Sequence, residues 1–116
     1  MSDVNDYYFS KLLLFQTVVK DCQKQSISLS SFINKVEDLL DILEQFDLVE
    51  WSEKVRAIWL ELEIKYAVML NENRLEFSKE EQKEIEKIVN EIYYYVEEQI
   101  EKIPEDYWYK SYSSTM

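Results

Sequence analysis

The chain has 116 residues, enough for one domain with one hydrophobic core. Hydrophobic residues make up 47% of it and aromatic residues 15%, which excludes wholesale disorder. The formal net charge of −11 argues against nucleic acid as a direct ligand, because phosphate binding depends on Lys and Arg. The same charge favours a basic protein partner, or simply keeps the protein in solution.

Gly is absent and Pro occurs once, at Pro104. A β-rich fold of this size needs tight turns with positive φ, for which Gly is the usual residue, whereas a helical fold needs few such positions. We therefore predict an all-α fold, with residues 1–116 forming a single helical domain.

The sequence predicts a cytoplasmic protein. Its uninterrupted apolar runs, such as Leu12–Phe15, are far shorter than the roughly 20 residues of a membrane span. The N-terminus lacks the basic start and apolar core of a signal peptide. Cys22 is the single cysteine, so no disulfide can form within the chain, which fits a reducing compartment.

The first predicted helix covers about residues 5–25. Its apolar residues recur at spacings of four and three, which is the pattern of one helix face. They are Tyr8, Leu12, Phe15, Val19 and Cys22. Other apolar residues widen this stripe beyond half of the circumference, so we expect the helix to pack on more than one side.

The second predicted helix covers about residues 30–46, with Ser28 or Ser30 as its N-cap, because a Ser hydroxyl can accept from free backbone N–H groups. Its apolar face is Phe32, Val36, Leu39, Leu43 and Phe46.

The third predicted helix covers about residues 48–71, and Asp47 and Glu50 at its start have the spacing of a capping box. Its main apolar stripe is Trp51, Val55, Ile58, Leu62, Tyr66 and Met69. A second stripe on the opposite side is Ala57, Leu60, Ile64 and Val68. Either this helix is central to the fold, or the second stripe contacts another chain, such as a second copy in a homodimer.

The fourth predicted helix covers about residues 79–103. Ser78 and Glu81 form a capping box at its start, and Pro104 ends it. The tail, residues 104–116, contains Tyr107, Trp108, Tyr109 and Tyr112, and we expect it to fold over one end of the domain. Short connections favour antiparallel neighbours, so we predict an antiparallel four-helix bundle.

Catalytic and metal-binding residue patterns are missing from the sequence. There is no His, which is the commonest general base and metal ligand near neutral pH. No Gly-rich loop can hold phosphates, and Cys22 has no His to activate it. The Glu-x-x-His pairs of di-metal bundles cannot be formed either. We expect no enzyme activity, no catalytic residue, no metal and no cofactor.

The most informative feature is a run of acidic residues between Val36 and Glu53, where no Lys or Arg occurs. Its seven members are Glu37, Asp38, Asp41, Glu44, Asp47, Glu50 and Glu53. Asp41 and Glu44 lie near the end of a predicted helix, where the helix dipole disfavours negative charge. A cluster that destabilises the free protein suggests a basic partner, although a merely solvated face explains the acids as well.

Tyr94 is a further candidate for partner binding. It follows Tyr93 and precedes Tyr95, and three consecutive side chains on a helix point about 100° apart, so they cannot all be buried. Tyr94 lies on the polar face between Glu91 and Glu98, and exposed Tyr is enriched at the cores of protein interfaces.

The layout of residues 5–103, with an acidic second-to-third-helix region and Ser28–Phe32 opening the second helix, resembles the helical immunity proteins of the colicin D type. That family consists of bacterial four-helix bundles that neutralise tRNA-cleaving toxins by presenting acidic side chains to the basic RNA-binding cleft. The resemblance implies an immunity protein whose partner is a toxin nuclease domain, and it transfers no individual residue. Two other classes fit the same sequence: a phage-type nucleic-acid mimic that blocks a nuclease, and a helical module that oligomerises through Leu60, Ile64 and Val68.

Overall fold

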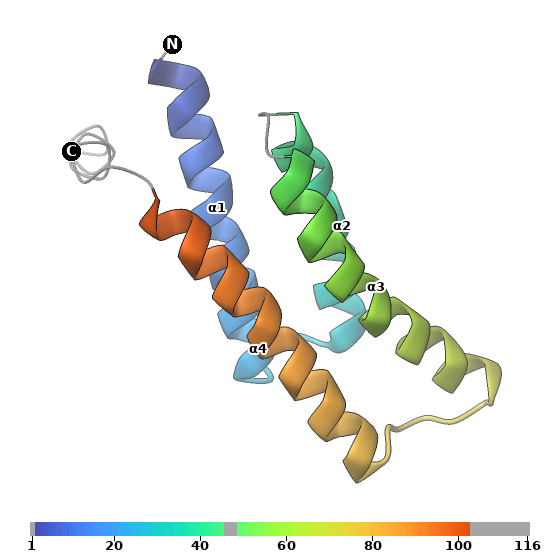
Figure 1. Ribbon diagram of the computed structural model, residues 1–116. Helices are drawn as coiled ribbons and strands as arrows, with labels where there is room; N and C mark the ends of the chain where they lie inside the picture. The colour runs from blue at the N-terminus through green and yellow to red at the C-terminus, as the bar shows by residue number, and fades with distance from the viewer. Residues whose placement is uncertain (1, 46–48, 103–116) are drawn as a thin grey trace.

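A computed structural model describes residues 2–45 and 49–102, and the side chains of all of these except residues 2–6. Within these residues there are four α-helices and no strand. The helices are α1 (Ser2–Gln23), α2 (Leu29–Glu44), α3 (Val49–Asn71) and α4 (Lys79–Glu101). Each helix runs opposite to the next and packs against it, and α1 also packs against α4 (Figure 1). The predicted all-α four-helix bundle is confirmed.

The core is built from one apolar face of each helix. In α1 this face is wide, because the helix contacts both α2 and α4. Its buried side chains are Phe9, Leu12, Phe15, Val18 and Val19. Fully burying one such aliphatic or aromatic side chain contributes about 1.5–3 kcal/mol, so these faces supply most of the folding free energy. Packing of α1 on more than one side, as expected from its wide stripe, is confirmed.

Two tryptophans join α3 to its neighbours. The indole Nε1–H of Trp59 donates to the backbone oxygen of Ile33 in α2 at 2.9 Å. That of Trp51 donates to the backbone oxygen of Tyr95 in α4 at 3.1 Å, while its ring packs edge-to-face on Phe15 of α1 with centroids 5.9 Å apart. A buried indole N–H needs a partner, so these bonds fix where α3 sits.

Serine caps set the beginnings of α2 and α4. Ser28 Oγ accepts from the backbone N–H of Ser31 at 3.1 Å. Ser78 Oγ accepts from the N–H of Glu81 at 3.2 Å, and the Glu81 carboxylate accepts from the N–H of Ser78 at 2.9 Å, which confirms the predicted capping box. The predicted roles of Phe46, Asp47 and Pro104, and the aromatic tail, lie outside the described residues.

Helices α1 and α3 end with the same backbone geometry, which the sequence pattern did not predict. Each helix is followed by a residue with a left-handed backbone, Gln25 with φ 61° and Asn73 with φ 57°. The next N–H groups then turn back: Ser26 donates to the oxygen of Asp21 at 2.8 Å, and Arg74 donates to that of Met69 at 3.0 Å. This is the Schellman arrangement, formed here without Gly. It ends α1 at Gln23, two residues before the predicted boundary.

Candidate protein-binding surface

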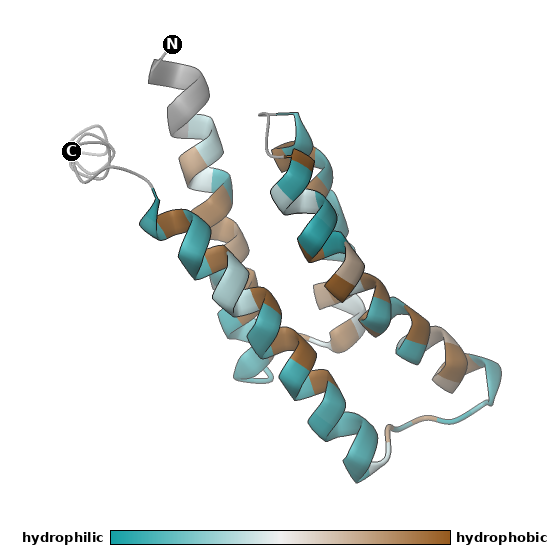
Figure 2. Ribbon diagram, viewed as in Figure 1, coloured by the Kyte–Doolittle hydropathy of each residue, from teal (hydrophilic) through white to brown (hydrophobic). Residues whose placement is uncertain are grey.

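The acidic residues lie along the second half of α2 and the start of α3. Six of the seven belong to the described residues, and Asp47 lies outside them. Five of those six are exposed, and Glu44 is half-buried. The two helices are antiparallel neighbours, so the last turns of α2 lie beside the first turns of α3, where Figure 2 shows extensive hydrophilic colouring.

Arg56 of α3 neutralises part of this surface from within the protein. Its Nη2 lies 2.8 Å from Asp41 Oδ1 and 3.1 Å from Glu44 Oε1, and its Nε donates to the same Glu44 oxygen at 3.3 Å. Burial acts to lower the pKa of Arg56, but the bonds that Arg56 donates to Asp41 and Glu44 have the larger combined effect, so its pKa is raised overall. Asp41 and Glu44, expected to destabilise the end of α2, are therefore compensated by Arg56.

Four other carboxylates have no partner within the described part of the chain. Glu37, Asp38, Glu50 and Glu53 are exposed, and none of them forms an ion pair or side-chain hydrogen bond with another described residue. Glu50 lies in the first turn of α3, where the helix dipole favours negative charge. The part of the surface that is open to a partner thus carries four negative charges and destabilises its own helices less than the sequence suggested.

Tyr94 is exposed to 62% on the outer side of α4 and packs edge-to-face on Tyr95, with ring centroids 5.8 Å apart. Hydrogen bonding with the Glu98 carboxylate, together with the charge of that group, raises the pKa of the Tyr94 hydroxyl. Helix α4 packs against α1 and α3, diagonally across the bundle from α2. The structure therefore does not bring Tyr94 together with Glu37 and Asp38.

The second stripe of α3 is exposed. Leu60, Ile64 and Val68 are exposed to 46%, 55% and 47%, while Val55 and Leu62 on the opposite side are fully buried. In Figure 2 the C-terminal half of α3 carries several hydrophobic positions, in contrast to the hydrophilic positions near its start. Helix α3 is therefore not central, and of the two expectations only a stripe open to another chain is compatible with the fold.

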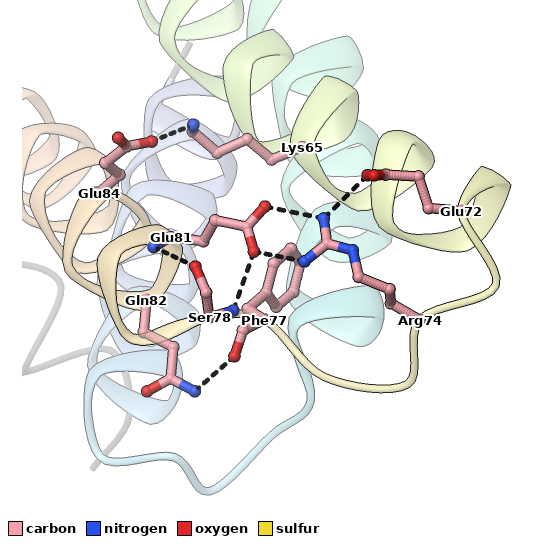
Figure 3. A network of polar contacts seen from close by, with 8 residues as sticks. All are labelled: Lys65, Glu72, Arg74, Phe77, Ser78, Glu81, Gln82 and Glu84. Atoms are coloured by element: carbon pink, nitrogen blue, oxygen red, sulfur yellow. Dashed lines mark hydrogen bonds and ion pairs between the residues drawn. The ribbon is translucent and has the colours of Figure 1, made fainter.

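A polar network at the α3–α4 connection was not foreseen from the sequence. Arg74 lies between Glu72 and Glu81 (Figure 3), with Nη1 at 2.7 Å from Glu81 and Nη2 at 3.1 Å from Glu72. The bonds from Arg74, and then that from the Ser78 N–H, lower the pKa of Glu81 to about 2. Nearby, Lys65 of α3 pairs with Glu84 of α4. These bonds fix the connection, although the buried Nε of Arg74 has no hydrogen-bond partner among the described residues.

A hollow lies between the end of α1, residues 25–29 and the start of α4. Its volume is about 490 Å³, and Cys22, Ile27, Phe77, Ile85 and Val89 supply much of its apolar lining. Burial raises the pKa of the Cys22 thiol to about 11, so the thiol holds its proton at neutral pH and is a poor nucleophile.

The described residues contain no group of three or more Asp, Glu, Cys or His side chains arranged to hold a metal ion. Among these residues, no helix combines the length and apolar character that crossing a membrane requires. Comparison with known proteins adds no relative: no family model, curated protein or solved structure matches the chain significantly.

Proposed function

We propose that this protein is an immunity-type inhibitor that binds and neutralises a basic, RNA-cleaving nuclease domain through the acidic surface of α2 and α3. The observation that supports this most directly is a set of exposed carboxylates that form no ion pair with another described residue, namely Glu37, Asp38, Glu50 and Glu53. A nuclease cleft lined with Lys and Arg would supply those cations. The nuclease class of the partner follows from the resemblance to colicin D-type immunity proteins.

Inhibition in this proposal needs no chemistry from the protein. The carboxylates occupy the positions that RNA phosphates take in the cleft and so exclude the substrate. Opposite charges steer the two proteins together, so association is fast at low ionic strength. Added salt screens the charges and lowers the association rate. The Asp41–Arg56–Glu44 cluster, already paired, contributes shape and rigidity more than charge.

The test uses the product of the adjacent gene, if it carries a basic C-terminal domain, as the partner. Association rates and protection of RNA from cleavage are measured at 50 and 500 mM NaCl. We expect the variant Glu37→Gln/Asp38→Asn/Glu50→Gln/Glu53→Gln to associate at least 10-fold more slowly at low salt, and to lose most of the salt dependence.

The matched control is Glu86→Gln, which removes an exposed carboxylate of α4 that has no ion pair with a described residue. It should bind and protect like the wild type. If the quadruple variant also protects like the wild type, the acidic surface is only solvated and the proposal is wrong.

A further inference from the structure

The outer face of α3 carries an apolar stripe that no other described residue covers. Leu60, Ile64 and Val68 follow one another at helical spacing of four, and the exposed Ala57 and Ala67 extend the stripe. From Ala57 to Val68 the stripe is about 17 Å long at 1.5 Å per residue. It points directly away from the core side of α3, so it is available to a second molecule.

Charges on one flank of the stripe alternate in sign, whereas the other flank carries Glu63 and Arg56, which is already paired with Asp41 and Glu44. On the flank that faces α4, Lys54, Glu61 and Lys65 follow each other along α3, and Glu72 comes directly after its last residue. Lys54 and Glu61 form no ion pair with any described residue, whereas Lys65 contacts Glu84 and Glu72 contacts Arg74. A surface of one sign repels a copy of itself, but an alternating one can match its own copy when the two helices run antiparallel.

We propose that this face of α3 binds the same face of a second copy of the chain, with the two α3 helices antiparallel and the twofold axis level with residues 62–63, where the exposed Glu63 and its symmetry mate form one like-charge contact. In this register Leu60 lies beside Ile64 of the second copy, and Ala57 lies beside its Val68. On the flank, Lys54 faces Glu72 of the second copy and Glu61 faces its Lys65, and symmetry repeats both pairs. This inference does not rest on the proposed function.

Helix α4 extends the contact. A groove of about 490 Å³ runs between α3 and α4, and Ile64 and Ile88 supply its apolar lining. Its remaining lining residues carry both signs of charge, which again suits a second copy better than a uniformly basic or acidic partner. They are Glu61, Lys65, Glu84, Lys87 and Glu91.

The size of the contact predicts a weak dimer. The paired segment from Lys54 to Glu72 is about 27 Å long, and a helix with its side chains is about 10 Å wide. An interface of one helix pair plus a groove falls at the small end of specific interfaces, below roughly 1,200 Å². Each copy also carries a net charge of −11, which opposes association at low ionic strength. Salt should therefore strengthen this dimer, whereas it should weaken binding to a basic nuclease.

Sedimentation equilibrium of the full chain from 10 μM to 1 mM, at 50 and 500 mM NaCl, tests the proposal. We expect the dimer fraction to rise with concentration and with salt, and Ile64→Ser to weaken association at least 10-fold. Leu14→Ser is the matched control, since Leu14 is a similarly exposed aliphatic residue, at 45%, on α1. Circular dichroism confirms that both variants keep the fold.

Charge reversal tests the register. Glu61→Lys and Lys65→Glu should each weaken self-association, because each places like charges opposite one another in the dimer. A 1:1 mixture of the two variants should associate again, since each then meets its complement. A chain that is monomeric at 1 mM and 500 mM NaCl, or a dimer that Ile64→Ser leaves unchanged, overturns the proposal. A mixture that fails to associate overturns the antiparallel register.

Discussion

At the scale of single residues, Arg56 neutralises part of the acidic surface by pairing with two of its carboxylates. It lies three residues beyond the acidic run and bonds to both Asp41 and Glu44, which are 15 and 12 positions away in the sequence. We predict that Glu44→Gln lowers the free energy of unfolding by about 0.2–1 kcal/mol, the range for partly exposed ion pairs. Urea denaturation of the two proteins measures the difference.

Glu37→Gln is the contrasting substitution. Glu37 lies one turn before Asp41 on α2 and has no ion pair with a described residue, so removing its charge relieves repulsion. Stability should hold or rise by a few tenths of a kcal/mol. If Glu44→Gln raised stability in the same way, Arg56 would not be stabilising the end of α2.

At the scale of elements, the end of α1 is a place where stability can be gained. Gln25 adopts φ 61° there, a left-handed conformation that costs an L-residue with a Cβ about 1–2 kcal/mol. We predict that Gln25→Gly raises the free energy of unfolding by about 0.5–1 kcal/mol, because Gly adopts this backbone without strain but loses more freedom on folding. Thermal unfolding followed by circular dichroism measures it.

The neighbouring substitution Ser26→Gly is the control, since Ser26 is not among the described residues with positive φ. It should leave stability unchanged or lower it slightly, because Gly there adds only unfolded-state entropy. Equal stabilisation by both substitutions would contradict the argument from backbone strain.

Local patterns in the sequence predicted the elements well. The Ser78–Glu81 box and the apolar period of each helix depend on residues within a few positions, so they can be recognised without a fold. The Trp59–Ile33 bond and the Arg56 and Arg74 pairs could not be predicted in the same way. They join residues brought together by packing or by a left-handed turn, and no short-range spacing encodes them.

At the scale of the whole molecule, the bundle separates surfaces of different character. The free carboxylates lie on α2 and the start of α3, the apolar stripe lies on the outer side of the rest of α3, and Tyr94 lies on α4. The two surfaces meet at the start of α3, where Glu53 adjoins Lys54 and lies one turn before Ala57, so a basic partner and a second copy have adjacent sites. Composition predicted that acidic contacts would dominate, but only the fold distinguishes carboxylates that are free from those already paired.

The contribution of one carboxylate, that of Glu81, to the pH dependence of stability can be measured separately. The folded-state pKa of Glu81 is about 2, below its ordinary value of 4.5, so the folded state holds this proton more weakly than the unfolded state. Its stabilising contribution is fully present above pH 4.5 and is lost as pH falls towards 2. We predict that Glu81→Gln lowers the urea midpoint at pH 7, and that this difference from the wild type shrinks steadily between pH 4.5 and 2.

The other acidic groups of the protein also change stability as the pH falls, and they do so in every variant. Comparing Glu81→Gln with a second variant therefore removes their contribution. Glu86→Gln provides the reference, because its carboxylate is exposed and has no ion pair with a described residue. Its midpoint should follow that of the wild type closely. Parallel curves for wild type and Glu81→Gln down to pH 2 would mean that the pairing of Glu81 with Arg74 and Ser78 does not couple protonation to folding.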